Sequence, residues 1–295
     1  MTPGNPPRLG ARRISLRGMD LRRARWRVIV LLLPLVILAV ALIDPHLVTG
    51  IDPLHTDPRA TLRAPSAAHL FGTDRLGRDV FSRVVHGTRY SVGIGLAATT
   101  LCVLAGVLWG LLSALAPAWL DEVSNRFLDA IGAFPGVLLC LVLITFTGTG
   151  SANLVVALAI AGTPRLARLV RSNARGALSM HHTTQAIIMG LTRRHVIGVH
   201  VLPRALAGVP HLAALEVGAA ILTASGLSFI GLGVQPPTPE WGAMMSEGRL
   251  VLRIAWWPSV FPGIATVAVV LLCALIGHGL STAAPSATSE TRNRS

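Results

Sequence analysis

The 295-residue sequence contains no lysine, so all 26 of its basic residues are arginine. Without lysine the chain cannot contain the phosphate-binding sequence GxxxxGK[ST], which excludes ATP hydrolysis by P-loop chemistry within this chain. Charged residues are scarce as well, at 13% against the roughly 25% typical of soluble domains. With a hydrophobic fraction of 52% and a mean hydropathy of +0.62, the composition predicts an integral membrane protein.

Acidic residues are half as frequent as basic ones, 13 against 26, which gives a net charge of +13. An excess of this size can indicate nucleic-acid binding. Here, however, the arginines are confined to short segments between long apolar runs. This arrangement favours the positively charged loops of a membrane protein, and we expect no nucleic-acid partner.

Patterns that bind metal ions or form disulfides are missing too. The three cysteines, Cys102, Cys140 and Cys273, lie inside apolar runs and have no CxxC or Cys/His spacing. They are therefore predicted to be small buried residues, with neither a disulfide nor a zinc site. No pair of histidines has the HExxH or HxxxH arrangement with a nearby carboxylate, so we expect no metal site.

Six apolar stretches are candidates for membrane spans, which need about 20 mostly apolar residues each. They lie at 26–43, 91–116, 131–148, 152–164, 205–232 and 259–280. The first is interrupted by Pro34 and is followed by no small-residue cleavage site, which favours a retained anchor over a signal peptide. The fourth is short unless it continues through Pro164 towards Leu169. We predict an all-α membrane protein with six transmembrane helices, closely packed through their frequent glycines.

The distribution of arginine predicts the orientation of these spans. The N-terminal tail (1–25) and the start of the first span carry eight arginines against one acidic residue, so this end is expected in the cytoplasm. Six spans then place the segment 44–90 outside, and the loop 164–204 and the tail 281–295 inside. The loop 164–204 has seven arginines and no acidic residue, whereas the inside loop 117–130 has one arginine against three acids and gives the rule no support.

The long inside loop contains apolar residues at helical spacing from Thr183 to His200. Gly190 interrupts the pattern and predicts a helix–turn–helix, while Pro203 predicts its end just before the fifth span. Composition and periodicity leave two interpretations open. The segment either lies on the lipid surface as an amphipathic helix or forms a docking surface for a partner protein.

Several longer segments resemble one known family. They read HLFGTDRLGRDVFSRVVHGTRYS (69–91), DEVSNRFLDAIGAFP (121–135), PRLARLVR (164–171) and LSFIGLGVQPPTPEWGAM (227–244). Together with the spacing from Gly190 to Leu202-Pro203, they resemble the permeases of ABC importers, most specifically the C-type permease subunit of the dipeptide/oligopeptide/nickel systems. The resemblance covers about residues 26–283.

The resemblance implies the type I ABC importer permease fold, with a five-helix core at 91–280 and a cytoplasmic coupling helix in the loop 164–204. The coupling residues that it implies are Thr184, Gln185, Ala186, Gly190, Leu202 and Pro203. Two positions depart from the family pattern. The family's E-A-A triplet aligns with Thr184-Gln185-Ala186, which lacks the acidic residue that contacts the ATPase, and Ala224 stands where the family often has glutamate.

The same resemblance implies the assembly around the chain. It consists of a second, homologous permease subunit in a heterodimer, two cytoplasmic ATPase subunits that bind ATP and magnesium, and an extracytoplasmic solute-binding protein. The chain itself would be neither an enzyme nor a cofactor carrier, and would lie in a bacterial inner membrane, surrounded by lipid, with both termini cytoplasmic. Di- and oligopeptides are the expected solutes. Nickel or another small solute stays open, since four histidines, His46, His55, His69 and His86, lie in the outer segment.

Two other classes of protein fit less well. A self-contained secondary transporter would carry charged or polar residues in several spans and inverted repeats. An intramembrane enzyme would need a catalytic constellation within the spans, and the sequence has none. Glu216 is the one acidic residue inside a predicted span, and with Ser225 and Ser228 it is assigned to the translocation pathway. A hydrogen-bonded position at a helix interface is the alternative for Glu216.

The outer segment contains a motif of turn glycines and alternating charges. Its residues are Gly72, Thr73, Asp74, Gly77, Arg78, Asp79 and Arg83. Asp79 and Arg83 are four residues apart and are predicted to pair on one helix face. The motif is interpreted as a structural, ion-paired cap, or alternatively as an interfacial helix that shapes the outer mouth and contacts a binding protein.

Overall fold

The computed structural model describes residues 34–283. The predicted N-terminal tail, residues 26–33 of the first span and residues 284–295 lie outside the described part of the chain, as do the side chains of residues 182, 184 and 187. Within the described part the regular elements are helical, apart from a single β-bridge between Thr73 and Asp79. The prediction of an all-α chain is therefore confirmed.

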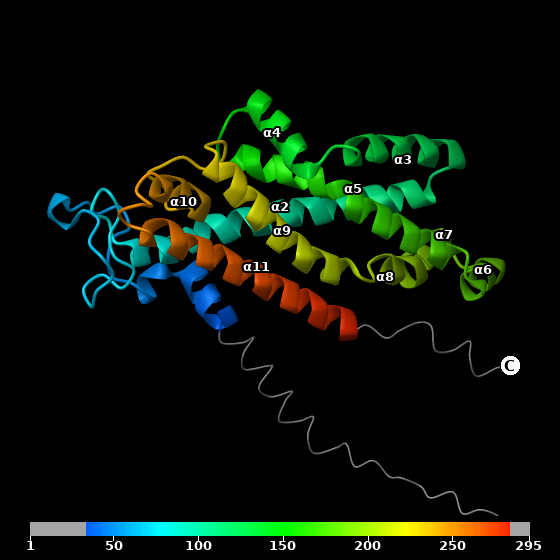
Figure 1. The fold of residues 1–295 in the computed structure, drawn as a ribbon. Coiled ribbons are helices and arrows are strands. Elements are labelled where there is room, and N and C mark those ends of the chain that lie inside the picture. Colours follow the sequence, from blue (N-terminus) through cyan, green and yellow to red (C-terminus); the bar gives the residue numbers. More distant parts are fainter. Residues whose placement is uncertain (1–33, 284–295) are drawn as a thin grey trace, which may run out of the picture.

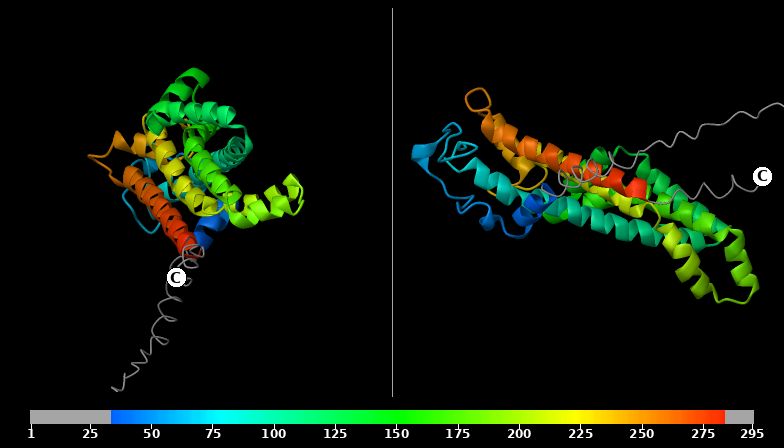
Figure 2. Two further views of the ribbon diagram at one scale, coloured as in Figure 1. Left: turned by 90° about the vertical axis from the view of Figure 1, so that its right-hand side faces the viewer. Right: turned by 90° about the horizontal axis from the view of Figure 1, so that it is seen from below.

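The longer helices are α2 (Val80–Leu115), α3 (Ala118–Gly132), α4 (Gly136–Thr147), α5 (Ser151–Leu178), α9 (Val209–Phe229), α10 (Trp241–Arg249) and α11 (Trp257–Ala283). The shorter ones are an apolar helix Pro34–Ile43, η1 (Pro45–Leu47), η2 (Pro58–Ala60), α6 (His181–Ile188), α7 (Arg193–Val196), η3 (Ile197–Val201) and α8 (Leu202–Ala205). The long helices run along one elongated bundle, with the outer segment at one end and α6 at the other (Figures 1 and 2).

Four described helices, α2, α5, α9 and α11, are long and apolar enough to cross a membrane. The pair α3 and α4 meets the same criterion only as a unit, and the two helices are bent by 89° relative to each other. The described residues thus contain four or five candidate spans. The first predicted span is described only from Pro34 onwards.

Two helices extend beyond the spans that were predicted for them. The helix predicted at 91–116 begins 11 residues earlier, at Val80, and the helix predicted at 152–164 continues to Leu178. Pro164 therefore lies inside α5 and does not end it. In a packed bundle, neighbouring helices and Ser/Thr side chains compensate for the amide that proline lacks. The first 15 residues of the predicted loop 164–204 are helical.

The region 117–148 differs from its prediction as well. The expected loop 117–130 is the amphipathic helix α3, and the expected span 131–148 shrinks to α4, whose 12 residues reach only about 18 Å. Pro135 separates the two helices, because it has no N–H to donate and disfavours the helical conformation of the residue before it. The chain consequently turns sharply where a straight span was expected.

Helices α2 and α5 are packed through glycine. A Cβ atom on Gly106 would lie 2.7 Å from Cβ of Leu166, and one on Gly110 would lie 2.6 Å from the carbonyl oxygen of Ala167. The two backbones approach so closely only because these positions have no side chain, which is how membrane helices gain packing energy without a hydrophobic effect between them. This contact joins the middle of the bundle into one unit.

We expect Gly110→Ala to destabilise the protein by about 1–3 kcal/mol, because the added methyl group overpacks the α2–α5 contact. Gly93→Ala, in the same helix, is the matched control: a Cβ atom there meets nothing within 4 Å. Thermal unfolding of the purified protein in detergent compares the two. An equal unfolding temperature for both variants would show that α2 and α5 are not in close contact.

Candidate functional site

The segment after α5 forms a helical hairpin at one end of the bundle. The hairpin consists of α6, a turn at residues 189–192, and α7. Helix α6 ends in a Schellman motif, in which Gly190 has the left-handed φ of +85° and the amide of Leu191 donates to the carbonyl of Ala186 at 3.1 Å. Thr192 then caps α7 by accepting from the amide of His195 at 3.4 Å. The Gly-Leu-Thr sequence thus encodes a tight, defined turn, and the predicted helix–turn–helix is present.

The tip of this hairpin is apolar and exposed. Ile188 and Met189, at the end of α6, are 78% and 77% exposed, and the side chains of Arg193 and Arg194 on α7 are exposed beside them. Figure 2 shows that α6 stands away from the long helices. Two large, exposed apolar side chains with arginines close by in the sequence suit a surface that contacts another protein.

The other predicted coupling residues lie in the same hairpin or behind it. Ala186 is buried in its base, whereas Gln185 is exposed and hydrogen-bonds His181 at 2.9 Å. The side chain of Thr184 lies outside the described residues. Leu202 and Pro203 are separate from the tip and belong to α8, so the two halves of the predicted set do not form one cluster.

Pro203 does not end a helix, contrary to the prediction. Helical structure runs without a break from Arg193 to Ala205 through α7, η3 and α8. In a regular α-helix the ring of Pro203 would clash with the carbonyl of Val199. The segment before it, η3, is a π-helical turn, which widens the helix at this point. The helix ends instead near Gly208, whose left-handed φ of +81° precedes α9.

Most arginines of the predicted loop 164–204 do not face a partner. Arg168 pairs with Asp129 at 2.9 Å, and Arg171 and Arg175 both pair with Asp121 at 2.6 Å. Arg165 is 4.0 Å from Glu216. Arg204 contacts Sδ of Met180. At least five of the seven arginines therefore have partners within the molecule, and the arginine-rich docking surface expected from composition is restricted to the hairpin.

Asp121 joins three helices at the end of the bundle that carries the hairpin. Its buried carboxylate accepts hydrogen bonds from the hydroxyl of Ser113 in α2 at 2.6 Å and from Arg171 and Arg175 of α5. Asp121 itself lies in the first turn of α3. The three acidic residues of 117–130 gave no support to the orientation rule. Two of them, Asp121 and Asp129, are ion-pair partners of arginines in α5.

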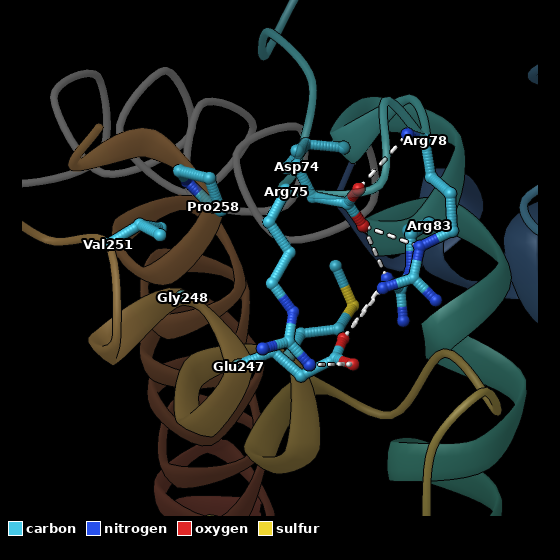
Figure 3. A pocket seen from close by; sticks show the side chains of 10 residues that line it. Asp74, Arg75, Arg78, Arg83, Glu247, Gly248, Val251 and Pro258 are labelled. Carbon is cyan, nitrogen blue, oxygen red and sulfur yellow. Dashed lines mark hydrogen bonds and ion pairs between the residues drawn. The ribbon is translucent and has the colours of Figure 1, made fainter. Parts of the chain in front are cut away.

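At the opposite end a buried ion cluster connects the outer motif to α10. The carboxylate of Asp74 accepts from Arg78 and Arg83 at 2.6 Å each, and Glu247 of α10 accepts from the same two arginines at 2.9 and 3.2 Å (Figure 3). The side chains of Arg78 and Arg83 are only 3% and 2% exposed. The remaining space between these groups, about 10 Å³, has room for about one water molecule.

The predicted pair of Asp79 with Arg83 does not form. Asp79 has an extended backbone and is the N-cap of α2, where its carboxylate accepts from the amide of Ser82 at 2.7 Å and contacts His69 at 2.9 Å. The free amides of the first helical turn attract this carboxylate, which leaves Arg83 to pair with Asp74 and Glu247. Of the two interpretations of the motif, its geometry fits the ion-paired cap.

The remaining residues of the motif shape the turn. Gly72 and Gly77 have left-handed φ values of +71° and +75°. A Cβ atom on Gly77 would lie 1.8 Å from the carbonyl oxygen of Asp57. Thr73 is fully buried, accepts from the amide of Arg63 at 2.8 Å, and its carbonyl accepts from Trp257 of α11 at 2.9 Å.

The ion cluster also changes the acidity of Asp74. Burial opposes the ionised form, but the guanidinium groups of Arg78 and Arg83 and the amide of Leu76 outweigh burial and hold the pKa of Asp74 below its ordinary value. The carboxylate is therefore charged across the physiological range.

The predicted pathway residues are divided between two places. Glu216, in α9, borders a cavity of about 210 Å³ between α4, α5 and α9. Ser225 and Ser228 are each 2% exposed and do not line this cavity. Ser225 packs against the first turn of α10 and Ser228 against the segment before it, since Cβ atoms on Gly242 and Gly233, respectively, would collide with them. Their role in the pathway stays a prediction.

Three acidic residues of this architecture were not singled out from sequence: Asp121, Glu240 and Glu247. Glu240 is fully buried and caps α10 by accepting from the amides of Gly242 and Ala243. The unexpected acidity of the loop 117–130 was the available signal for Asp121. The side-chain partners of the two glutamates, Ser91 for Glu240 and Arg78 for Glu247, lie about 150 residues or more away in the sequence, so local spacing does not reveal them.

The chain is similar to proteins of known activity. A family model described as "Binding-protein-dependent transport system inner membrane component" matches residues 106–284, more than half of the chain. A glutathione transport system permease protein, GsiD, of Pectobacterium atrosepticum is 40% identical over 216 residues, 73% of this chain and 72% of that protein. A dipeptide transport system permease protein, DppC, of Alkalihalophilus pseudofirmus is 36% identical over 261 residues, 88% of this chain and 86% of that protein.

Solved structures of the same fold exist at low sequence identity. A chain of the MetNI methionine ABC transporter in an inward-facing conformation superposes with a TM-score of 0.57 at 17% identity, over 69% of this chain and 96% of that one. A chain of an amino acid ABC transporter gives a TM-score of 0.54 at 16% identity, over 68% and 94% of the two chains. These likenesses concern the fold.

We expect Asp74→Asn to destabilise the protein by about 3–5 kcal/mol, because it leaves two buried guanidinium groups with one carboxylate between them. The unfolding temperature in detergent measures the loss. Glu122→Gln removes an equivalent charge from an exposed ion pair with Arg126 and should change stability little. Similar unfolding temperatures for the two variants would contradict the role of the buried cluster.

The stabilisation by Asp74 should depend on pH in one direction. Because folding lowers the pKa of Asp74, its contribution is complete above the unfolded-state pKa of about 3.9 and is lost as the pH falls through the lower folded-state pKa. The difference in unfolding temperature between the wild type and Asp74→Asn should therefore be constant from pH 7 to about 5 and shrink below about 4. A difference that grows on acidification would contradict this assignment.

Proposed function

Because the chain belongs to the family of binding-protein-dependent transport system inner membrane components, we propose that it is the permease subunit of an ATP-driven importer of di- and oligopeptides. The names of the relatives support peptides as the solute class, since dipeptides and glutathione are short peptides. The observation that carries the coupling role is the exposed apolar tip of the hairpin, Ile188 and Met189, at the end of the bundle.

In this proposal the tip docks on a cytoplasmic ATPase subunit that binds ATP and magnesium. Helix α5 supports the mechanism, because it runs unbroken from Ser151 to Leu178 and leads into α6 after two residues. A displacement of the hairpin would pass directly to α5. Through Asp121 it would also reach α2 and α3, since that carboxylate binds groups from both neighbours of α3. Closure of the ATPases thereby biases the two orientations of the bundle.

The topology that we propose has six spans and both termini in the cytoplasm. The bent pair α3 and α4 serves as the third span, and the residues from Trp26 to Ile43 form the first. The end with α6 is cytoplasmic because the adjoining segments carry the arginine excess. The ion-paired cap then faces outward, where it fixes the outer end of α2 against α10.

A pathway for a peptide requires more protein than this chain supplies. The described part of the chain offers four or five candidate spans, and the cavity that Glu216 borders has a modest volume of about 210 Å³. We therefore propose a heterodimer with a second, homologous permease subunit, two ATPase subunits beneath it, and a solute-binding protein that delivers the peptide outside. The chain lies in the inner membrane of a bacterium and carries no cofactor of its own.

We expect Gly190→Val to lower both ATPase co-purification and ATP-driven uptake by a factor of about 5–30. A β-branched residue with left-handed φ costs on the order of 1–2 kcal/mol, which shifts the turn towards other conformations by such a factor. Gly190→Asn should retain most of both activities, because asparagine tolerates this φ. Co-purification in mild detergent and uptake into proteoliposomes provide the two measurements.

Gly176→Val is the matched control for this experiment. Gly176 lies in α5, and a Cβ atom there meets nothing within 4 Å. Gly176→Val introduces the same side chain a few residues before the hairpin, at a helical position that requires no left-handed φ. If Gly190→Val retained wild-type uptake and ATPase association, the coupling assignment of the hairpin would be wrong.

A further inference from the structure

The cavity beside Glu216 leaves space around the carboxylate of this residue. Five of the residues that line it have a methyl group or no side chain at all: Gly136, Ala161, Gly162, Ala219 and Ala220. A Cβ atom on Gly162 would lie 2.6 Å from Oε1 of Glu216. The carboxylate therefore lies directly against the backbone of α5, and its position depends on glycine at 162.

Glu216 is incompletely neutralised compared with the other buried carboxylates of the chain. Asp74 and Asp121 each bind two arginines at 2.6 Å. Within the described residues, Glu216 has one ion pair, with Arg165 at 4.0 Å, and accepts no hydrogen bond. The side chain of Glu216 is 15% exposed, whereas that of Arg165 is 61% exposed and is not held in place by burial. A mostly buried anion with so weak a partner attracts a further cation.

The surroundings restrict which cation fits. Divalent metal ions take several oxygen, nitrogen or sulfur ligands at once. Among residues 34–283 no group of three or more His, Cys, Asp or Glu side chains is arranged to hold one. An organic ammonium ion needs only one carboxylate and space for its substituents. The cavity of about 210 Å³ with its small lining residues provides that space.

We propose that Glu216 binds the ammonium group of the transported solute as it passes between α4, α5 and α9. For a peptide this group is the α-amino terminus or a lysine side chain, and the inference rests on the proposed function in this respect. Between transport events Arg165 is paired with the carboxylate of Glu216. It moves away when the ammonium group of the solute takes its place. The carboxylate thus keeps a cationic partner throughout transport.

Chemical labelling of Glu216 tests the site without relying on transport. The complete importer in detergent is treated with dicyclohexylcarbodiimide, and modification of Glu216 is quantified by mass spectrometry. We expect tri-alanine to slow the modification and N-acetyl-tri-alanine, which lacks the ammonium group, to leave it unchanged. N-acetyl-Ala-Lys-Ala has its only ammonium group on the lysine side chain. Whether it slows the modification shows whether that ammonium group also binds. Equal modification with and without tri-alanine overturns the proposal.

Uptake into proteoliposomes tests whether this contact serves transport. Glu216→Gln keeps the size of the side chain and should lower uptake of tri-alanine about tenfold, since it removes a charge-assisted contact. Glu216→Asp should restore part of the rate, and Glu122→Gln is the matched control for loss of a carboxylate at an exposed position. If the pair of Glu216 with Arg165 were only structural, Arg165→Gln would cause the same loss as Glu216→Gln. We expect Arg165→Gln to lose much less, and equal losses overturn the proposal.

The experiments distinguish a failure of the proposed peptide transport from a failure of the Glu216 site. If the wild-type importer shows no ATP-driven uptake of tri-alanine, the peptide assignment of the proposed function fails, and the labelling result still decides whether Glu216 binds an ammonium group. If uptake is ATP-driven but Glu216→Gln transports as the wild type does, the proposed function stands and the Glu216 site is wrong.

Discussion

Close packing of α2 against α5 is the contact on which the rest of the structure depends. It forms because Gly106 and Gly110 allow one backbone to reach the other. Helix α2 carries the buried ion cluster at its outer end, and α5 carries the hairpin at the opposite end. Since both are single, unbroken helices, the contact connects the ion-paired cap at one end of the bundle to the hairpin at the other. A movement of the hairpin can therefore be transmitted along the bundle.

Charge neutralisation is organised in three places along this unit. The outer cluster of Asp74 and Glu247 and the inner cluster of Asp121 each hold two arginines tightly, so they fasten helices together. At the third place, Glu216 is paired within residues 34–283 with one distant arginine, and it adjoins a cavity. The strong clusters suit the parts that must stay fixed during transport, and the weak one suits a contact that must be exchanged. This difference connects the packing of the bundle to its function.

The sequence predicted the helical fold, the approximate positions of the long apolar helices and the turn at Gly190, because these depend on local signals: apolar runs, glycine and capping residues. It did not predict the bend between α3 and α4, and it left open whether α5 continues through Pro164, since tertiary packing decides whether a proline breaks a helix. It also assigned Asp79 the wrong partner. Local spacing favoured Arg83, whereas helix capping and the distant Glu247 determine the observed pairs.

The central claim is that the hairpin tip is the surface on which an ATPase subunit docks. A photo-activatable crosslinking residue in place of Met189, in membranes that contain the complete importer, tests it most directly, because this side chain is almost fully exposed at the tip. The account predicts a crosslinked product that mass spectrometry identifies as this chain joined to an ATP-binding subunit. Crosslinks to lipid alone, while that subunit is present and active, would contradict the account.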